Sequence, residues 1–286
     1  MTKPIVVGTD GSPPAERAVE WAATEAERRG RRLHIVYAVR SPEPGSVTGI
    51  RRGRSPDDAR EHVLARAAEI AAKTSPNVAV TTEPVSDAPT SALRERAGRA
   101  SEIVVGHRGR SGIAELLHGS TGLSLAGRTP CPLVIVRGEL AEERHEVLAG
   151  VDPYDGESER VLAYAFETAS QRAAWVRAVY TWEVPPTLFN GAYPATVRQA
   201  LTAAQSRLGD AVAPWRTRYP KVRVIEETPP GRPMDALVER SSRADLLVVG
   251  SSRHGAGLRI GSVGDAVIHH AACPVVVLGV RATVTV

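Results

Sequence analysis

The feature that most constrains this chain is an internal repeat. Three pairs of identical residues are each separated by 142 positions and occur in the same order in both halves: Asp10 and Asp152, Gly119 and Gly261, and Cys131 and Cys273. A fourth match joins IVVG at 103–106 to LVVG at 247–250. Four matches in the same order predict two copies of one domain. The predicted domains are 1–140 and 145–286, joined by the polar segment 138–145.

Composition narrows the class of protein. The 286 residues suffice for two domains of ordinary size, and 42% of them are hydrophobic although only 4% are aromatic. Alanine, valine and leucine must therefore fill the cores, which favours parallel sheets covered by alanine-rich helices. The net charge of +4 comes from basic residues interleaved with acidic ones, so we expect no nucleic-acid surface.

The sequence carries no pattern typical of export or membrane insertion. No apolar stretch reaches the ~18 residues of a membrane-spanning helix, and the N-terminus leads into a strand without a signal-peptide core. Cys131 and Cys273 each precede a proline and an apolar run, which is not a disulfide framework. We expect a cytoplasmic protein with reduced cysteines; a paired or reactive thiol is the alternative.

Each copy alternates short apolar runs with segments of helical pattern. In the first copy the predicted strands are 5–8, 33–39, 78–80, 103–105 and 133–136. One predicted helix starts at Pro13 after a Ser12 cap, and another starts at Ser55. The remaining predicted helices are 89–100 and 119–128, and 157–172, 195–213 and 233–242 in the second copy. This alternation predicts an α/β fold with a parallel, doubly wound, Rossmann-like sheet in each copy.

Two segments of the first copy are candidates for a ligand site. In doubly wound sheets, ligands bind beyond the carboxyl ends of the strands, where the strand order reverses. Gly8–Ser12 follows the first strand, and the glycine-rich segment GHRGRSGIAELLHGST at 106–121 follows the fourth. Glycine lets backbone N–H groups approach an anion closely, and a helix N-terminus adds further donors. The segment predicts a phosphate cradle that is neither a P-loop nor a GxGxxG fingerprint; tight turns alone are the alternative.

Several stretches resemble one known family. The pattern Gly106-x2-Gly109-x9-Gly119-Ser120 resembles the ATP-binding signature of the universal stress protein family, and VVGTDGSPPAERAVEWA, HGST and PCPLVIV follow the family's order. The resemblance covers nearly the whole chain, twice, so the chain looks like a tandem, bacterial universal stress protein. It implies a five-stranded parallel sheet in each copy, and it implies ATP and Mg²⁺ as ligands.

The resemblance also implies roles for residues of the first copy. It places Asp10 against the adenine, Ala38 and Val105 beside the base, and the glycines and hydroxyls on the ribose and triphosphate. The predicted binding residues are Gly8, Thr9, Asp10, Ala38, Val105, Gly106, Arg108, Gly109, Gly119, Ser120 and Thr121. Two alternatives stay open: Asp10 caps the turn that follows it, and Arg108 is a solvated charge rather than a phosphate partner.

The second copy departs from this pattern in its glycine-rich loop. The loop spans 13 positions between its outer glycines in the first copy but 11 between Gly250 and Gly261. Arg253 stands where the first copy has Gly109; its Cβ would obstruct a close phosphate, although its guanidinium could pair with one. The predicted residues of the second site are Asp152, Gly250, Arg253, Gly261, Ser262 and Val263.

No catalytic constellation is evident in the sequence. His269 and His270 are adjacent on a predicted helix and point in different directions, so they cannot share a metal ion. Ser120 has no evident base. We therefore predict an ATP-binding regulator of stress response or dormancy with unidentified protein partners, and at most slow ATP hydrolysis. The alternatives are a slow ATPase or nucleotidyl-transfer enzyme, and a scaffold that needs no ligand.

The last strand of each copy is expected at an edge of its sheet. Segments 133–136 and 275–278 are apolar, and an apolar edge invites pairing. We expect these strands to pair about a pseudo-two-fold axis within the chain, as the resemblance implies for the dimers of single-domain relatives. A homodimer of the whole chain is compatible with the same pattern.

Overall fold

The chain folds into two compact units, Met1–Leu140 and Ala141–Val286. The computed structural model describes residues 2–39, 56–107, 120–138, 143–182, 194–251 and 260–279. Each unit is a doubly wound α/β domain, so the predicted fold class is confirmed.

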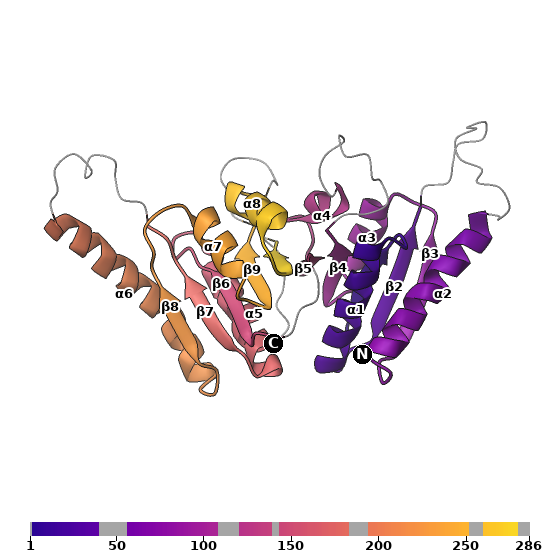
Figure 1. Ribbon diagram of the computed structural model, residues 1–286, viewed down its shortest axis with the longest axis horizontal. Helices are drawn as coiled ribbons and strands as arrows, with labels where there is room; N and C mark the ends of the chain where they lie inside the picture. The colour runs from indigo at the N-terminus through magenta and orange to yellow at the C-terminus, as the bar shows by residue number, and fades with distance from the viewer. Residues whose placement is uncertain are drawn as a thin grey trace. The chain divides into compact units, whose positions relative to one another are not determined.

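Unit 1 is a five-stranded parallel sheet between two helical layers. Its strands are β1 (Ile5–Thr9), β2 (Leu33–Ala38), β3 (Val80–Val85), β4 (Glu102–Gly106) and β5 (Leu133–Val136). Its helices are α1 (Pro13–Arg28), α2 (Pro56–Thr74), α3 (Pro89–Ala97) and α4 (Ser120–Leu125). The strand order is β3-β2-β1-β4-β5, all parallel. Helices α1 and α2 contact each other, as do α3 and α4, so two helices cover each face (Figure 1).

Unit 2 repeats this architecture. Its strands are β6 (Glu146–Gly150), β7 (Trp175–Val179), β8 (Val224–Glu227), β9 (Leu246–Gly250) and β10 (Val275–Leu278). Its helices are α5 (Ser158–Arg172), α6 (Pro194–Arg218), α7 (Pro233–Ser241) and α8 (Ser262–His270). The strand order is β8-β7-β6-β9-β10, again parallel, with α5 against α6 and α7 against α8.

The start, the buried face and the end of α1 follow from its residues. Proline at the first helical position is pre-organised for the helix. Ala18, Ala22 and Ala26 recur every four residues and are fully buried, so one face of small side chains lets the helix lie close to the sheet. Gly30 then adopts a left-handed φ of 57° beyond the helix end.

The third strand lies later in the sequence than predicted. The expected strand was 78–80, whereas β3 starts at Val80 and continues to Val85. Its residues are intermediate or exposed, so it lacks an apolar run that would reveal it. Pro84 is tolerated because β3 is an edge strand of the unit 1 order and needs fewer ladder donors.

Helix α6 extends beyond its predicted end at residue 213. Pro214 lies inside the helix and cannot donate a backbone hydrogen bond, yet the helix continues to Arg218. The next turn is held by aromatic packing, because the Trp215 ring stacks on Phe166 of α5 at 6.2 Å and on Tyr219 at 6.4 Å. Tertiary packing therefore overrides the local signal for a helix end.

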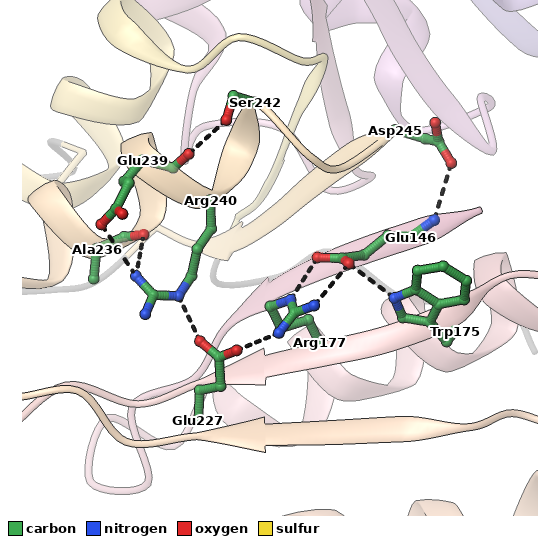
Figure 2. A network of polar contacts seen from close by, with 9 residues as sticks. All are labelled: Glu146, Trp175, Arg177, Glu227, Ala236, Glu239, Arg240, Ser242 and Asp245. Carbon is green, nitrogen blue, oxygen red and sulfur yellow. Dashed lines mark hydrogen bonds and ion pairs between the residues drawn. The ribbon is translucent and has the colours of Figure 1, made fainter. Parts of the chain in front are cut away.

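A polar network crosses the sheet of unit 2 (Figure 2). The Glu146 carboxylate, only 3% exposed, accepts hydrogen bonds from Arg177 at 2.6 and 3.0 Å and from the Trp175 indole at 2.8 Å. Arg177 also contacts Glu227, which accepts a hydrogen bond from Arg240 at 2.6 Å. One buried carboxylate and three partly buried charged groups thus pair with each other across three strands and α7.

Unit 1 carries a smaller version of this network. Glu83 accepts hydrogen bonds from Arg96 at 2.5 and 2.9 Å, and its Oε2 lies 2.9 Å from the His34 ring. Arg96 and, to a lesser degree, His34 hold the pKa of Glu83 at about 2. Pro4 stands where unit 2 has Glu146, so unit 1 has no carboxylate at this position of its first strand.

No helix in the described part of the chain is long and apolar enough to cross a membrane. The residues of strands β5 and β10 are all buried. The expected pairing of β5 with β10 depends on how the two units are placed relative to each other, so it stays a prediction.

Candidate nucleotide site

The candidate site of unit 1 lies where its strand order reverses. Strand β1 pairs with β2 on one side and with β4 on the other. The chain therefore winds outward from β1 through β2 and β3 and then returns to β4, which opens a crevice beyond the carboxyl ends of β1 and β4. The turn at 10–12 leaves β1 at this point, and the glycine-rich segment 106–121 leaves β4 there.

The turn after β1 is held by its own side chains. Asp10 Oδ1 accepts hydrogen bonds from the Ser12 amide at 3.0 Å and the Ser12 hydroxyl at 2.5 Å, and the Gly11 amide donates to Thr9 Oγ1 at 3.2 Å. Gly11 has a φ of 72°, which favours glycine. Asp10 therefore does cap the turn, and this bond fixes the orientation of its carboxylate.

The expectation that Ser12 caps α1 with its side chain is wrong. Ser12 occupies the N-cap position, but its hydroxyl makes no cap hydrogen bond to the helix. The hydroxyl instead donates a short, charge-assisted hydrogen bond to Asp10 Oδ1.

Two of the predicted binding glycines have packing reasons to lack a side chain. A Cβ on Gly106 would lie 2.6 Å from the Pro14 carbonyl oxygen, so β4 and the first turn of α1 can meet only at glycine. A Cβ on Gly8 would lie 2.9 Å from the Leu93 side chain of α3. Close packing thus accounts for these two positions whether or not a phosphate lies near them.

The other predicted residues of unit 1 divide into two groups. Ala38 and Val105 are buried at the ends of β2 and β4, at 7% and 5% exposure, and Thr121 lies in α4. Arg108, Gly109 and Gly119, and the side chain of Ser120, lie outside the described residues. The phosphate part of the site therefore remains a prediction from the sequence.

Unit 2 has the same turn at its own point of strand reversal. Asp152 Oδ1 accepts a hydrogen bond from the Tyr154 amide at 3.0 Å, as Asp10 does from Ser12. The Gly261 amide donates to the Ser251 carbonyl at 3.1 Å, which ties the start of α8, and with it Ser262 and Val263, to the end of β9. Arg253 lies outside the described residues.

A cavity of about 440 Å³ lies beyond the carboxyl ends of β6 and β7. It is lined by Asp152, Tyr154, Tyr180, Thr181, Trp182, Ala200, Ala203, Ala204, Arg207 and Pro233. Of these, the sequence predicted only Asp152 as a site residue. The others come from the turn after β6, from the segment after β7, and from α6 and α7, and no spacing in the sequence shows that these segments meet.

The strand registers relate this cavity to the predicted base site of unit 1. Val36 of β2 pairs with Gly8, and Val179 of β7 pairs with Gly150. Ala38 lies two residues after Val36, and Thr181 lies two residues after Val179, so Thr181 in the cavity wall corresponds to Ala38 of unit 1. The residue expected beside the base in the first copy therefore has its counterpart in the wall of this cavity.

The fold and the two turns define a tandem doubly wound α/β protein with a candidate ligand site in each unit. The chain belongs to the universal stress protein family: the family model matches residues 1–137 and 143–279. It is 33% identical to the universal stress protein Rv2005c of Mycobacterium tuberculosis over 298 residues, covering 97% of this chain and 99% of that protein. It is 34% identical to Rv2623 of the same species over 292 residues, covering 96% and 95%.

A solved structure supports the fold alone. The crystal structure of a universal stress protein from Archaeoglobus fulgidus superposes with a TM-score of 0.67 at 17% identity, covering 98% of this chain and all of that one. The tandem organisation predicted from the repeat is confirmed by the double match to the family model.

Proposed function

We propose that the chain is an adenine-nucleotide-binding regulator in which unit 1 holds ATP. The observation that carries this proposal is that the Asp10 turn and the start of the glycine-rich segment leave the neighbouring strands β1 and β4 at the point of strand reversal in unit 1. Membership of the universal stress protein family supports it. In this proposal the protein acts in the cytoplasm, and the bound nucleotide alters its contacts with protein partners.

In this proposal, different residues of unit 1 bind the base and the phosphates. The turn orients the Asp10 carboxylate, which can accept a hydrogen bond from the amino group of adenine. Backbone amides at Gly109 and Gly119 and hydroxyls at Ser120 and Thr121 would hold the phosphates. Mg²⁺ bound with the nucleotide would offset the charge of the phosphates.

The proposal includes binding without efficient turnover. Among the described residues, no three His, Cys, Asp or Glu side chains are grouped so that they could hold a metal ion. The sequence also shows no general base beside Ser120. We expect ATP to be held rather than hydrolysed. A turnover number on the order of 10 s⁻¹ would instead place the chain among enzymes.

Calorimetry with ATP and Mg²⁺ on the full chain tests the site. Gly109→Val should abolish binding to unit 1, because its side chain obstructs the phosphates, and the circular dichroism spectrum should not change. Gly98→Val is the matched control, since a Cβ there meets nothing within 4 Å. Unchanged ATP affinity in folded Gly109→Val would show that the site is misplaced.

A further inference from the structure

We propose that unit 1 has a second binding site, in a groove beside α3, for a small organic carboxylate that carries an apolar body. The groove has a volume of about 610 Å³ and lies toward the amino ends of β1 and β2. The candidate nucleotide crevice lies beyond the carboxyl ends of β1 and β4 instead. The proposal therefore goes beyond the nucleotide function and does not depend on it.

The groove follows from the alternation of side chains along three neighbouring strands. Residues two positions apart in extended chain face the same side of a sheet. Three such pairs, in or just before β1, β2 and β3, line the groove: Pro4 and Val6, Arg32 and His34, and Thr81 and Glu83. Helix α3 and the turn after it supply the rest of the lining with Glu95, Arg96 and Arg99. The groove therefore lies between this face of the sheet and the end of α3.

Unit 2 places different side chains at the corresponding positions. The strand registers match four residues of the groove to residues of unit 2: Pro4 to Glu146, Arg32 to Trp175, His34 to Arg177, and Thr81 to Ile225. In unit 2 the Glu146 carboxylate accepts hydrogen bonds from the Trp175 indole and from Arg177 (Figure 2). Unit 2 thus carries a carboxylate and an apolar ring on its own chain where unit 1 has a proline and a guanidinium beside an open groove.

The carboxylates that line the groove are both paired with one guanidinium. Glu83 accepts hydrogen bonds from Arg96 at 2.5 and 2.9 Å, and the Glu95 carboxylate lies 3.8 Å from the same guanidinium. Among the described residues, no carboxylate pairs with Arg32 or Arg99, which also line the groove. These two guanidinium groups are therefore the cations that can bind an anion from solution.

The His34 ring is engaged by other side chains of the groove. Its Nδ1 lies 2.8 Å from Thr81 Oγ1, and its Nε2 lies 2.9 Å from Glu83 Oε2. Both ring nitrogens thus have partners without a ligand, and the ring is held in one orientation. The binding of an anion therefore depends on Arg32 and Arg99 rather than on the histidine.

The shape and the lining of the groove select the kind of anion. A planar guanidinium binds a carboxylate through two parallel hydrogen bonds. Pro4 and Val6 add an apolar surface on which the rest of a ligand can pack. The volume lies within the range of about 300–1,000 Å³ that is typical of small-molecule sites, so acetate or inorganic phosphate would fill only a small part of it. The groove therefore favours an organic acid with an apolar body over a small anion.

Phenylacetate is the probe for this site, and nuclear magnetic resonance of the amide groups of the full chain is the measurement. We expect one site per chain with a dissociation constant of about 1 mM, because so small a ligand buries little surface. The amides of Val6, His34 and Arg99 should shift, whereas those of Leu148 and Arg177, at positions of unit 2 that match Val6 and His34, should not.

Two sets of probes separate the charge from the apolar body. Phenylacetamide keeps the ring and removes the charge, and acetate and inorganic phosphate keep a charge and remove the ring. Each should bind at least about tenfold more weakly than phenylacetate, since a charge-assisted hydrogen bond or the burial of a ring is lost. Equal affinity for phenylacetamide would overturn the role of the charge, and equal affinity for acetate or phosphate would overturn the preference for an apolar body.

Substitutions test which residues bind the carboxylate. Arg32→Gln and Arg99→Gln should each weaken the binding of phenylacetate at least about tenfold. Arg94→Gln is the matched control, because Arg94 is exposed on α3 and does not line the groove, and it should leave the affinity unchanged. The amide spectrum of each variant shows directly whether the chain is folded.

Pro4→Glu tests the comparison with unit 2. It supplies on the chain the carboxylate that unit 2 carries at this position, so it should compete with phenylacetate and weaken its binding at least about tenfold more than Pro4→Gln does. Equal effects of Pro4→Glu and Pro4→Gln would overturn the comparison.

The remaining outcomes decide whether the site exists. The absence of saturable phenylacetate binding below about 20 mM, or binding that neither Arg32→Gln nor Arg99→Gln weakens, would overturn the proposal. Shifts confined to the residues around Asp10 would place the ligand in the nucleotide crevice and would overturn it too. Because the groove and the crevice lie at different ends of the strands, failure of ATP to bind would refute the proposed function and leave this site standing.

Discussion

The polar network of unit 2 allows a quantitative prediction about folding. Arg177→Met removes the guanidinium that donates two hydrogen bonds to Glu146 and leaves this carboxylate 3% exposed beside an apolar side chain. Removing one partner of a buried ion pair costs about 3–5 kcal/mol, because the remaining charge has lost its compensation. The Arg177 side chain is itself 19% exposed, so water can enter when it is removed, and we expect the free energy of unfolding to fall by about 3 kcal/mol.

A second substitution isolates the charge from the packing. The double variant Glu146→Gln/Arg177→Met leaves no buried charge at position 146, and the Gln carbonyl can still accept the hydrogen bond from the Trp175 indole. We expect the double variant to recover at least half of the loss, and to lie within about 1.5 kcal/mol of the unsubstituted chain. Arg216→Met is the control, since Arg216 pairs with Glu226 while 52% exposed, and should cost no more than about 1 kcal/mol.

The full chain is unfolded in urea, and the unfolding of each unit is monitored by hydrogen exchange with mass spectrometry. Peptides from β7 report on unit 2, and peptides from β2 report on unit 1 as an internal reference. Arg177→Met should lower the urea midpoint only in unit 2. A loss below about 1 kcal/mol, or a double variant no more stable than Arg177→Met, would refute the reasoning.

Three further predictions concern unit 1. Gly106→Ala should cost about 1–3 kcal/mol in urea unfolding, because its Cβ meets the Pro14 backbone, whereas Gly98→Ala, which meets nothing, should be neutral or stabilising; equal effects would contradict this explanation. The pKa of Glu83 is lowered from 4.5 to about 2, so its stabilising contribution is present above pH 4.5 and is lost as the pH falls toward 2. Glu83→Gln should therefore flatten this part of the pH dependence of the urea midpoint, and an unchanged slope would argue against the ion pair. Burial raises the pKa of Cys131 to about 12, so iodoacetamide at neutral pH should label it only after unfolding; rapid labelling of folded protein would refute its burial.

The sequence predicted those parts of the fold whose residues carry a periodic pattern. The apolar runs of β5 and β10 coincide with strands because every residue in them is buried. Strand β3 was displaced in the prediction because an edge strand with exposed residues has no such run. The end of α6 was missed because the stacking of Trp215 on Phe166 is a tertiary contact, which no local pattern around Pro214 encodes.

The candidate sites, too, could be predicted from the sequence only in part. The Asp10 and Asp152 turns could be found because the repeat places them after the first strand of each copy. The cavity wall at Trp182 and Arg207 could not be predicted from the sequence, because it depends on which turn of α6 covers the end of β7.

The two units keep the same glycines for packing and differ in what packs on them. Gly8 and Gly150 both face a leucine, Leu93 or Leu237, and a Cβ at either would lie 2.9 Å from it. The glycine that ends the fourth strand of each unit faces the first turn of the first helix, where the contacting residue can change from a neutral proline to a glutamate without altering the sheet. The group that packs on this glycine therefore differs between the units while the strand order stays the same. Identity of fold between the units is therefore no argument for identity of ligand, and the ligand must be argued for each unit from its own site.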